Sequence, residues 1–183
     1  MRAAPFALSA ILAAVSLAAC TSEGSTSVET TQVTPPAPPP SHDYTHPHYG
    51  FVLPVPDWLG EPTESDDGTG VTWSARDVTL MARGGQVPKG EKLDPETVNA
   101  QWERKGAEVT YRSMEDEKNF SISGYTDGTR DTIFYERYDV AGKNYRQTQW
   151  LYPTSMKVEM DAPVTASVIN YVTGPMGKGL PAK

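Results

Sequence analysis

Cysteine is almost absent from this chain, which has a single one, Cys20, among 183 residues. One cysteine excludes a disulfide within the chain and any zinc site built from several cysteines. Positive charge is also in short supply, because 16 lysines and arginines face 23 aspartates and glutamates and the formal net charge is -7. Proteins that bind nucleic acids rely on cations that neutralise phosphates. We therefore predict no nucleic-acid partner.

Histidine is scarce as well, and its three copies, His42, His46 and His48, lie within one short stretch. A serine or cysteine nucleophile needs a base beside it, and histidine is the usual one. The rest of the chain offers no histidine, and the sequence has neither a Gly-x-Ser-x-Gly nor a P-loop motif. These absences argue against the enzyme classes that depend on such groups, and we predict no cofactor.

The first 20 residues have the pattern of a secretory signal that ends in a lipidation site. Met1 and Arg2 precede an apolar run that is shorter than the ~20 residues a membrane-spanning helix needs. The run closes on Leu17-Ala18-Ala19-Cys20, which resembles the lipobox of bacterial lipoproteins. This resemblance implies cleavage after Ala19 and attachment of a diacylglyceryl group to the Cys20 sulfur, a good nucleophile as thiolate. An ordinary signal peptide with a cysteine at its end is the alternative.

Residues 1–19 are therefore predicted to be a lipoprotein signal peptide, and Cys20 is predicted to carry acyl chains. At about 0.8 kcal/mol per buried methylene, two or three chains anchor a protein stably, whereas one chain does so only marginally. Thr21 follows the cysteine, at the position where a signal for inner-membrane retention usually has aspartate. We expect a cell-envelope lipoprotein, held at the outer membrane and facing the periplasm if the host has two membranes.

Residues 20–48 are predicted to form a disordered, proline-rich linker behind the lipidated cysteine. The prolines between 35 and 40 favour extended polyproline II structure. Their PxxP spacing also fits ligands of SH3-like grooves, which stays an alternative. The three histidines near the end of this segment could bind Zn²⁺ or Cu²⁺, although a solvated linker without a metal site is the preferred interpretation.

Regular patterning covers residues 49–172, a typical length for one domain, and residues 173–183 are predicted to be a flexible tail. Alternation of apolar and polar residues, interrupted by turn residues, predicts a series of strands. Their ranges are 49–56, 71–75, 78–82 (ended by Gly84 and Gly85), 108–112, 119–125, 130–138 and 145–152.

Two helices are predicted among these strands. The first covers 94–105, with Asp94 as the N-cap, Pro95 at the first helical position and Gly106 after its end. The second begins after Asp161, with Pro163 in its first turn. Its buried stripe is predicted at every fourth residue, namely Val164, Val168 and Val172. Hairpins with one helix in mid-chain and one at the end predict an α+β fold, an antiparallel sheet covered by helices.

The chain also resembles PsbP-like domains, which are widespread in bacterial secreted proteins and lipoproteins. The resemblance lies in Tyr49-Gly50-Phe51, in residues 106–111 and 120–125, in Phe134-Tyr135-Glu136-Arg137, and in Tyr152-Pro153 before a terminal helix. It implies an α-β-α sandwich over residues 49–172, with a central antiparallel sheet flanked by helices. Because known members mostly bind partners or assist assembly, it also implies a non-enzymatic module and transfers no catalytic residue.

The predicted hairpin of 130–152 carries several aromatic residues interleaved with arginines. A partner-binding patch centred on Arg137, Arg146 and Trp150 is one interpretation, and packing of these residues in the interior is the other. We expect a lipid-anchored module that binds an unidentified envelope protein or component through its sheet edge or a helix-flanked cleft. Two other classes stay open: an envelope hydrolase that uses paired carboxylates, and a metal-handling lipoprotein that uses the three histidines.

Overall fold

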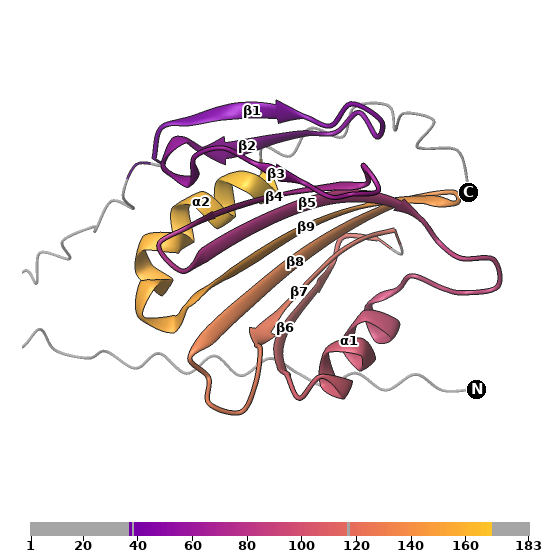
Figure 1. Ribbon diagram of the computed structural model, residues 1–183. Coiled ribbons are helices and arrows are strands. Elements are labelled where there is room, and N and C mark those ends of the chain that lie inside the picture. Colours follow the sequence, from indigo (N-terminus) through magenta and orange to yellow (C-terminus); the bar gives the residue numbers. More distant parts are fainter. Residues whose placement is uncertain (1–36, 38, 117, 170–183) are drawn as a thin grey trace, which may run out of the picture. The chain divides into compact units, whose positions relative to one another are not determined.

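The computed structural model describes residue 37 and residues 39–116 and 118–169 (Figure 1). Cys20, the predicted signal segment 1–19 and the predicted tail 173–183 lie outside these residues, as does most of the predicted linker. Within the described part, no helix combines the length and the apolar character needed to cross a membrane.

An antiparallel sheet of seven strands forms the centre of the described domain, in the order β3-β4-β5-β9-β8-β7-β6. The strand bounds are β3 Thr63–Glu64, β4 Gly70–Ala75, β5 Val78–Gln86, β6 Glu108–Met114, β7 Asn119–Tyr125, β8 Thr132–Ala141 and β9 Asn144–Pro153. A separate two-stranded antiparallel sheet consists of β1 (Ser41–Thr45) and β2 (Val52–Pro56). Each long strand predicted from alternation is present.

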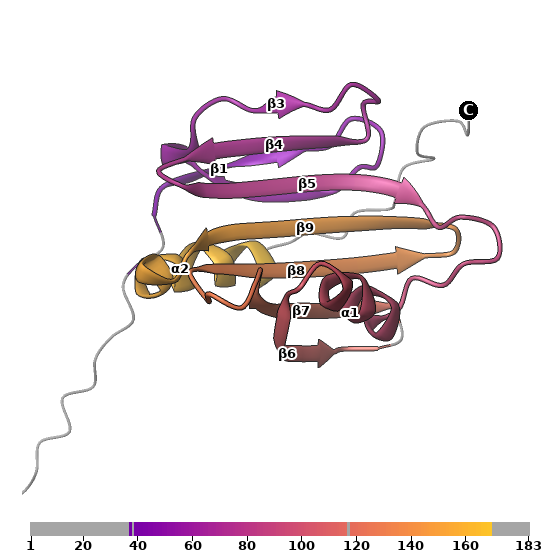
Figure 2. The ribbon, with the colours of Figure 1, turned by 60° about the horizontal axis from the view of Figure 1, so that its bottom comes forward.

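Helices cover both faces of the central sheet (Figure 2). Helix α1 (Pro95–Arg104) lies on one face, and helix α2 (Lys157–Ile169) lies on the other together with the β1–β2 hairpin. Short 3-10 turns at Asp57–Leu59 and Thr154–Met156 complete the described elements. The predicted α-β-α sandwich with a central antiparallel sheet is therefore confirmed, with a hairpin added to one outer layer.

Two apolar cores result, one on each face of the sheet, because successive residues of a strand point to opposite faces. Ile133 and Phe134 are neighbours on β8 and belong to different cores. The core on the α2 side contains the largest buried side chains, including Trp73, Trp150 and Met160. The core on the α1 side is smaller.

Helix α1 starts and ends where its capping residues predict. The Asp94 carboxylate accepts a hydrogen bond from the Thr97 backbone N–H at 2.8 Å. Hydrogen bonds from the Thr97 side chain and backbone lower the pKa of Asp94. Gly106 takes a φ of 86° just after the helix, a conformation that glycine adopts at little cost.

Strand β5 runs past Gly84 and Gly85 to Gln86, so the prediction that these glycines end the strand is wrong. Both serve a packing role instead. A Cβ built on Gly84 would lie 2.1 Å from the Tyr49 ring, and one built on Gly85 would lie 2.5 Å from the Tyr145 ring. The missing side chains let the two tyrosine rings lie directly on opposite faces of β5.

Helix α2 begins at Lys157, four residues before Asp161, so its predicted start is wrong. Pro163 lies inside the helix rather than in its first turn. Burial explains why the helix tolerates this proline: the residues facing the sheet are Met160, Pro163, Val164 and Ser167, at the spacing of an amphipathic helix. Val168 and Val172, the other members of the predicted stripe, lie outside the part whose side chains are described.

The ordered domain starts earlier than predicted, because residues 41–45 form strand β1 instead of the end of a linker. Ser41 pairs with Pro56 and Thr45 pairs with Val52 in an antiparallel register. The Tyr44 ring meets the Trp73 ring edge-on, with centroids 5.0 Å apart. The prediction that the linker extends to residue 48 is therefore wrong. Strand β1 forms because it pairs with β2, which follows it after a turn, and the composition of residues 41–45 alone does not reveal this pairing.

His46 is part of the folded domain rather than of a solvated arm, and only 2% of it is exposed. Its Nδ1 accepts hydrogen bonds from the backbone N–H groups of His48, at 3.2 Å, and Tyr49, at 3.3 Å. Burial lowers the pKa of His46 below its usual value of 6.5. The neutral imidazole therefore closes the turn between β1 and β2.

We expect the free energy of unfolding to fall as the pH drops below about 6.5, the pKa of an ordinary histidine. The unfolded chain takes up a proton at His46 before the folded one does, because the folded-state pKa is lowered. The contribution of neutral His46 to the free energy of unfolding is therefore complete above pH 6.5. It is lost as the pH falls towards the pKa of His46 in the folded protein, which is lower. Urea denaturation at several pH values would measure it. A His46→Phe variant should be less stable at pH 7.5 and should lack this part of the pH dependence. An unchanged pH dependence in that variant would contradict the assignment.

Candidate functional site: the cleft beneath helix α1

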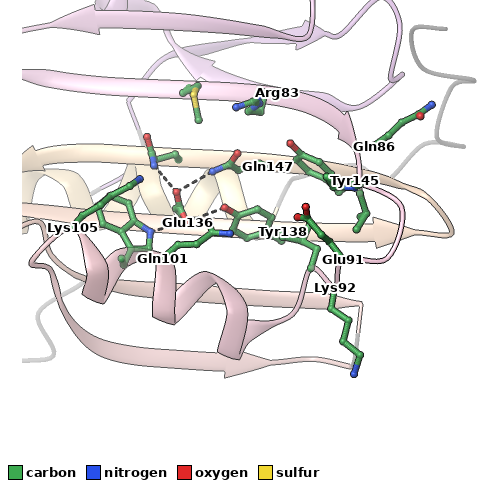
Figure 3. A pocket seen from close by; sticks show the side chains of 16 residues that line it. Arg83, Gln86, Glu91, Lys92, Gln101, Lys105, Glu136, Tyr138, Tyr145 and Gln147 are labelled. Carbon is green, nitrogen blue, oxygen red and sulfur yellow. Dashed lines mark hydrogen bonds between the residues drawn. The ribbon is translucent and has the colours of Figure 1, made fainter. Parts of the chain in front are cut away.

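A cleft of about 450 Å³ lies between the central sheet and helix α1 (Figure 3). We call it the α1 cleft. Strands β5, β8 and β9, helix α1 and the loop of residues 87–93 all contribute to its lining. The charged side chains in the lining are Arg83, Glu91, Lys92, Lys105 and Glu136.

The position of α1 on the sheet creates the cleft. The helix packs mainly against β6 and β7 and reaches β8 through the Trp102 ring on Phe134, so the same face of β5 and β9 is not covered by helix. On this face Arg83 pairs with Gln147 across strands, and Glu136 pairs with Gln149. The strands therefore present polar side chains at the positions where a covered face would carry apolar ones.

Glu136 lies in the wall of the α1 cleft and is 3% exposed. Its Oε2 accepts hydrogen bonds from Trp102 Nε1, at 2.9 Å, and from the Tyr138 hydroxyl, at 3.1 Å. Its Oε1 accepts from Gln147 Nε2, at 2.9 Å, and also from Gln149 Nε2. A carboxylate has about four acceptor positions, so these four neutral donors fill them.

Aromatic stacking holds two of these donors in place. The Trp102 ring stacks on Phe134 with centroids 3.9 Å apart, and Lys105 Nζ lies 4.9 Å from the indole centroid. The Tyr138 ring stacks on Phe120 at 5.0 Å. Burial, followed by the charge of Glu136, raises the pKa of Tyr138 well above 10. Tyr138 thus keeps its proton and remains a donor.

Arg83 stands on the opposite wall of the cleft, on β5 (Figure 3). Its Nε is buried and has no hydrogen-bond partner in the described part of the chain. Gly70, its partner on β4, makes room for it, because a Cβ on Gly70 would lie 3.0 Å from the Arg83 Cβ.

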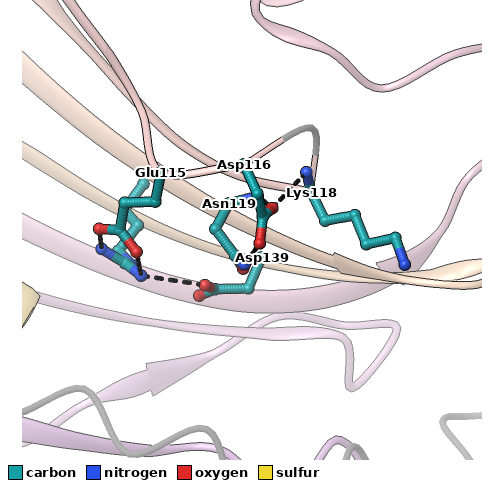
Figure 4. A network of polar contacts seen from close by, with 6 residues as sticks. Glu115, Asp116, Lys118, Asn119 and Asp139 are labelled. Atoms are coloured by element: carbon teal, nitrogen blue, oxygen red, sulfur yellow. Dashed lines mark hydrogen bonds and ion pairs between the residues drawn. The ribbon is translucent and has the colours of Figure 1, made fainter.

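The sequence-based site residues lie elsewhere, on the α2 side of the sheet. Arg137 is 9% exposed and donates to Glu115 Oε1 at 2.8 Å and to Asp139 Oδ1 at 3.2 Å. Figure 4 labels these two acidic partners. Asp116, beside this group, accepts from the backbone N–H groups of Lys118 and Asn119 and so shapes the turn between β6 and β7. Burial raises the pKa of Asp139, although Arg137 acts in the opposite direction.

Arg146 and Trp150 are also buried, at 2% and 0% exposure. Trp150 belongs to the core on the α2 side, and its Nε1 donates to the Ser167 hydroxyl of α2 at 2.9 Å. Interior packing, the other interpretation of the aromatic hairpin, therefore describes these residues, and they are not available as an exposed patch.

The three histidines do not converge. His42 Nδ1 lies 2.9 Å from Asp57 Oδ1, while the His46 and His48 rings lie edge-on to each other with centroids 6.1 Å apart. The Nδ1 of His46 is occupied by backbone N–H groups. The described residues contain no group of three or more His, Cys, Asp or Glu side chains that could hold a metal ion. The structure gives the metal-handling alternative no support.

Sequence analysis missed Glu136 as a site residue, although a signal for it exists. Glu136 stands between Phe134 and Tyr138 on a face that alternation marks as covered, and Gln147 and Gln149 alternate in the same way on the next strand. Polar residues at such positions indicate either a buried network or a cavity.

Comparisons with known proteins identify the fold of this chain, but they find no protein that is related to it by sequence. No protein-family model and no curated protein matches the chain. Among solved structures, it is similar to the solution structure of cyanobacterial PsbP (CyanoP) from Synechocystis sp. PCC 6803, with a TM-score of 0.57. The fold is that of PsbP. The match covers 72% of this chain and 91% of PsbP at 10% sequence identity, so it concerns the fold alone.

Proposed function

We propose that this protein is a lipid-anchored module of the cell envelope that binds an envelope component in the α1 cleft without transforming it. The observation that carries the proposal is a preformed cleft whose buried carboxylate, Glu136, is held by four neutral donors. Such a wall is rigid and polar, as binding with a defined orientation requires.

Binding is better supported than hydrolysis by the chemistry of the cleft. A general acid or base must exchange a proton with the reacting group, and hydrolysis by paired carboxylates needs a second acid close by. The oxygens of Glu136 are already engaged by four neutral donors, which leaves no acceptor position for the proton of a reacting group. Glu91 is a second carboxylate in the lining, but without a free acceptor position on Glu136 the two do not make an acid–base pair. The described lining also includes no serine, threonine, cysteine or histidine.

The lipid anchor is the second part of the proposal, and the lipobox ending at Cys20 supports it. The described fold begins with β1 at Ser41, so about 20 residues separate the two. A fully extended chain of that length, at about 3.1 Å per residue, would span roughly 60 Å.

A photo-crosslinking residue at position 101 of the full chain should capture the bound component in intact cells. Gln101 lines the cleft from α1 and is exposed. We expect an adduct that mass spectrometry can identify. In a detergent partition, the protein and its adduct should both be found in the detergent phase. Replacing Cys20 by serine should move the protein to the aqueous phase and reduce the adduct about tenfold or more, since membrane attachment concentrates the module near its target.

The same photo-crosslinking residue at Glu61 is the matched control, because Glu61 is exposed and lies outside the cleft lining. Equal adducts from both positions, or none from position 101, would refute binding in the cleft. Retention of the Cys20→Ser protein in the detergent phase would refute the anchor.

A further inference from the structure

Arg83 is the arginine in the lining of the α1 cleft, and within the described part of the chain no ion pair with an acidic side chain is formed by it. Arg76, Arg130 and Arg137 each contact a glutamate. Arg83 makes no such contact, and its buried Nε lacks any hydrogen-bond partner among the described residues. A guanidinium without an acid partner leaves its positive charge uncompensated at the cleft, so an anionic group of a ligand is a suitable partner for it.

Asp67 is an acidic residue near Arg83, and one of its carboxylate oxygens is already engaged. Asp67 is close enough to feel the charge of Arg83, but its Oδ1 accepts three hydrogen bonds, from Thr69 N–H, the Thr69 hydroxyl and the Ser65 hydroxyl. These hydrogen bonds, of which those from Thr69 have the largest effect, lower the pKa of Asp67 to about 2. Asp67 therefore stabilises its own turn, and no ion pair joins it to Arg83 among the described residues.

The charges of the cleft favour an acid group with one negative charge. Three cations, Arg83, Lys92 and Lys105, face two anions, Glu91 and Glu136. A surplus of one positive charge matches a carboxylate, whose two oxygens also fit the planar fork of a guanidinium. A phosphate dianion would leave negative charge uncompensated beside Glu136.

The rest of the polar lining favours a ligand rich in hydroxyl groups. Uncharged hydrogen-bonding groups are numerous: Gln86, Gln101, Gln147, Gln149, Tyr138 and Tyr145. The two glutamines on β9 give their amide N–H groups to Glu136, which leaves their amide oxygens to accept. The Tyr138 oxygen can likewise accept while its proton goes to Glu136. Acceptors in this arrangement suit hydroxyl donors.

We infer that the α1 cleft binds a hydroxylated carboxylic acid of the sugar-acid class, with Arg83 holding its carboxylate and the glutamine oxygens of β9 accepting from its hydroxyl groups. This inference rests on the proposed binding function and specifies its ligand. A volume of about 450 Å³ is within the range of small-molecule sites and accommodates one or two sugar rings.

Calorimetric titration of the full chain in mild detergent tests the inference, with D-glucuronate as the probe. We expect saturable binding of D-glucuronate. D-Glucose, which lacks the acid group, acetate, which lacks the sugar body, and inorganic phosphate should each bind about tenfold more weakly or worse. Arg83→Met should weaken D-glucuronate binding about tenfold or more, and Arg83→Lys should do so less. Arg104→Met, an exposed position outside the cleft, should leave it unchanged.

Three results would overturn the inference: no binding of D-glucuronate, equal binding by Arg83→Met, or tighter binding of glucose or phosphate. Thermal melting of each variant verifies that it is folded, and Arg83→Lys preserves the test if Arg83→Met does not fold. If adducts from position 101 persist while D-glucuronate does not bind, the ligand class is wrong and the binding function stands. If both are missing, both proposals fail.

Discussion

Replacing Glu136 by alanine is expected to lower the free energy of unfolding by about 4 kcal/mol, because each of its four donors then loses its acceptor at a cost of about 1 kcal/mol. The donors are the Trp102 indole, the Tyr138 hydroxyl and the amides of Gln147 and Gln149. They come from α1, β8 and β9, so the loss weakens the attachment of the helix to the sheet. Urea denaturation monitored by tryptophan fluorescence would measure the change.

Glu61→Ala is the matched control, since Glu61 is exposed and should change stability by less than about 0.5 kcal/mol. A double-mutant cycle locates the effect more sharply. The cycle combines Glu136→Gln with Trp102→Phe. The first substitution sets an amide N–H against the N–H and O–H groups that now donate to Glu136, and the second removes one of those donors. The two changes together should cost less than their sum. A Glu136→Ala protein as stable as the Glu61→Ala protein would show that the network contributes little.

Replacing Gly84 by alanine is expected to cost about 3 kcal/mol of stability, because it adds a methyl group to a site without space. The new Cβ would lie 2.1 Å from the Tyr49 ring, far inside van der Waals contact. Tyr49 is itself buried in the core on the α2 side, so its ring cannot swing into solvent without opening that core. The β1–β2 hairpin, which packs through this ring, should loosen from the sheet. Chemical denaturation gives the free energy, and hydrogen exchange should locate the loosening in β1 and β2.

Gly128→Ala is the control for this prediction, since a Cβ at Gly128 would meet no atom within 4 Å. Truncating the tyrosine should also relieve the clash. In a Tyr49→Ala background, Gly84→Ala should cost less than about 1 kcal/mol, because the ring that it strikes is gone. Equal costs in both backgrounds would mean that the contact with Tyr49 is not the cause.

The polar face beside α1 is where this chain departs most from an ordinary sandwich core. A buried carboxylate costs free energy to desolvate, and here four neutral hydrogen bonds offset the cost without a bonded cation. An apolar residue at position 136 with apolar partners would fill the same space more cheaply. Departures of this kind concentrate at functional sites. This reasoning is consistent with the α1 cleft as the place where the domain meets its ligand.

Local patterns were sufficient to predict most of the secondary structure. In β7, β8 and β9, successive residues face opposite sides of the sheet, and this produces an alternation that is visible in the sequence. Helix α1 begins at a cap, Asp94, whose hydrogen bond acts within one helical turn. The errors arose where distant contacts decide. Strand β1 needs β2 as its partner, and helix α2 keeps Pro163 in its interior because its apolar face packs on the sheet.

The sequence by itself determined the α+β sandwich, because side-chain periodicity, turns and caps are short-range properties that can be read along the chain. It also supplied the signal-like start and Cys20, on which the anchor hypothesis depends. Only the tertiary structure decided that Glu136 meets Trp102, 34 residues away, and that Arg83 stands across a cleft from it without an acid partner in the described residues. The site exists only after strands that are distant in sequence pair in register, since that pairing sets which polar side chains share a face and which of them meet.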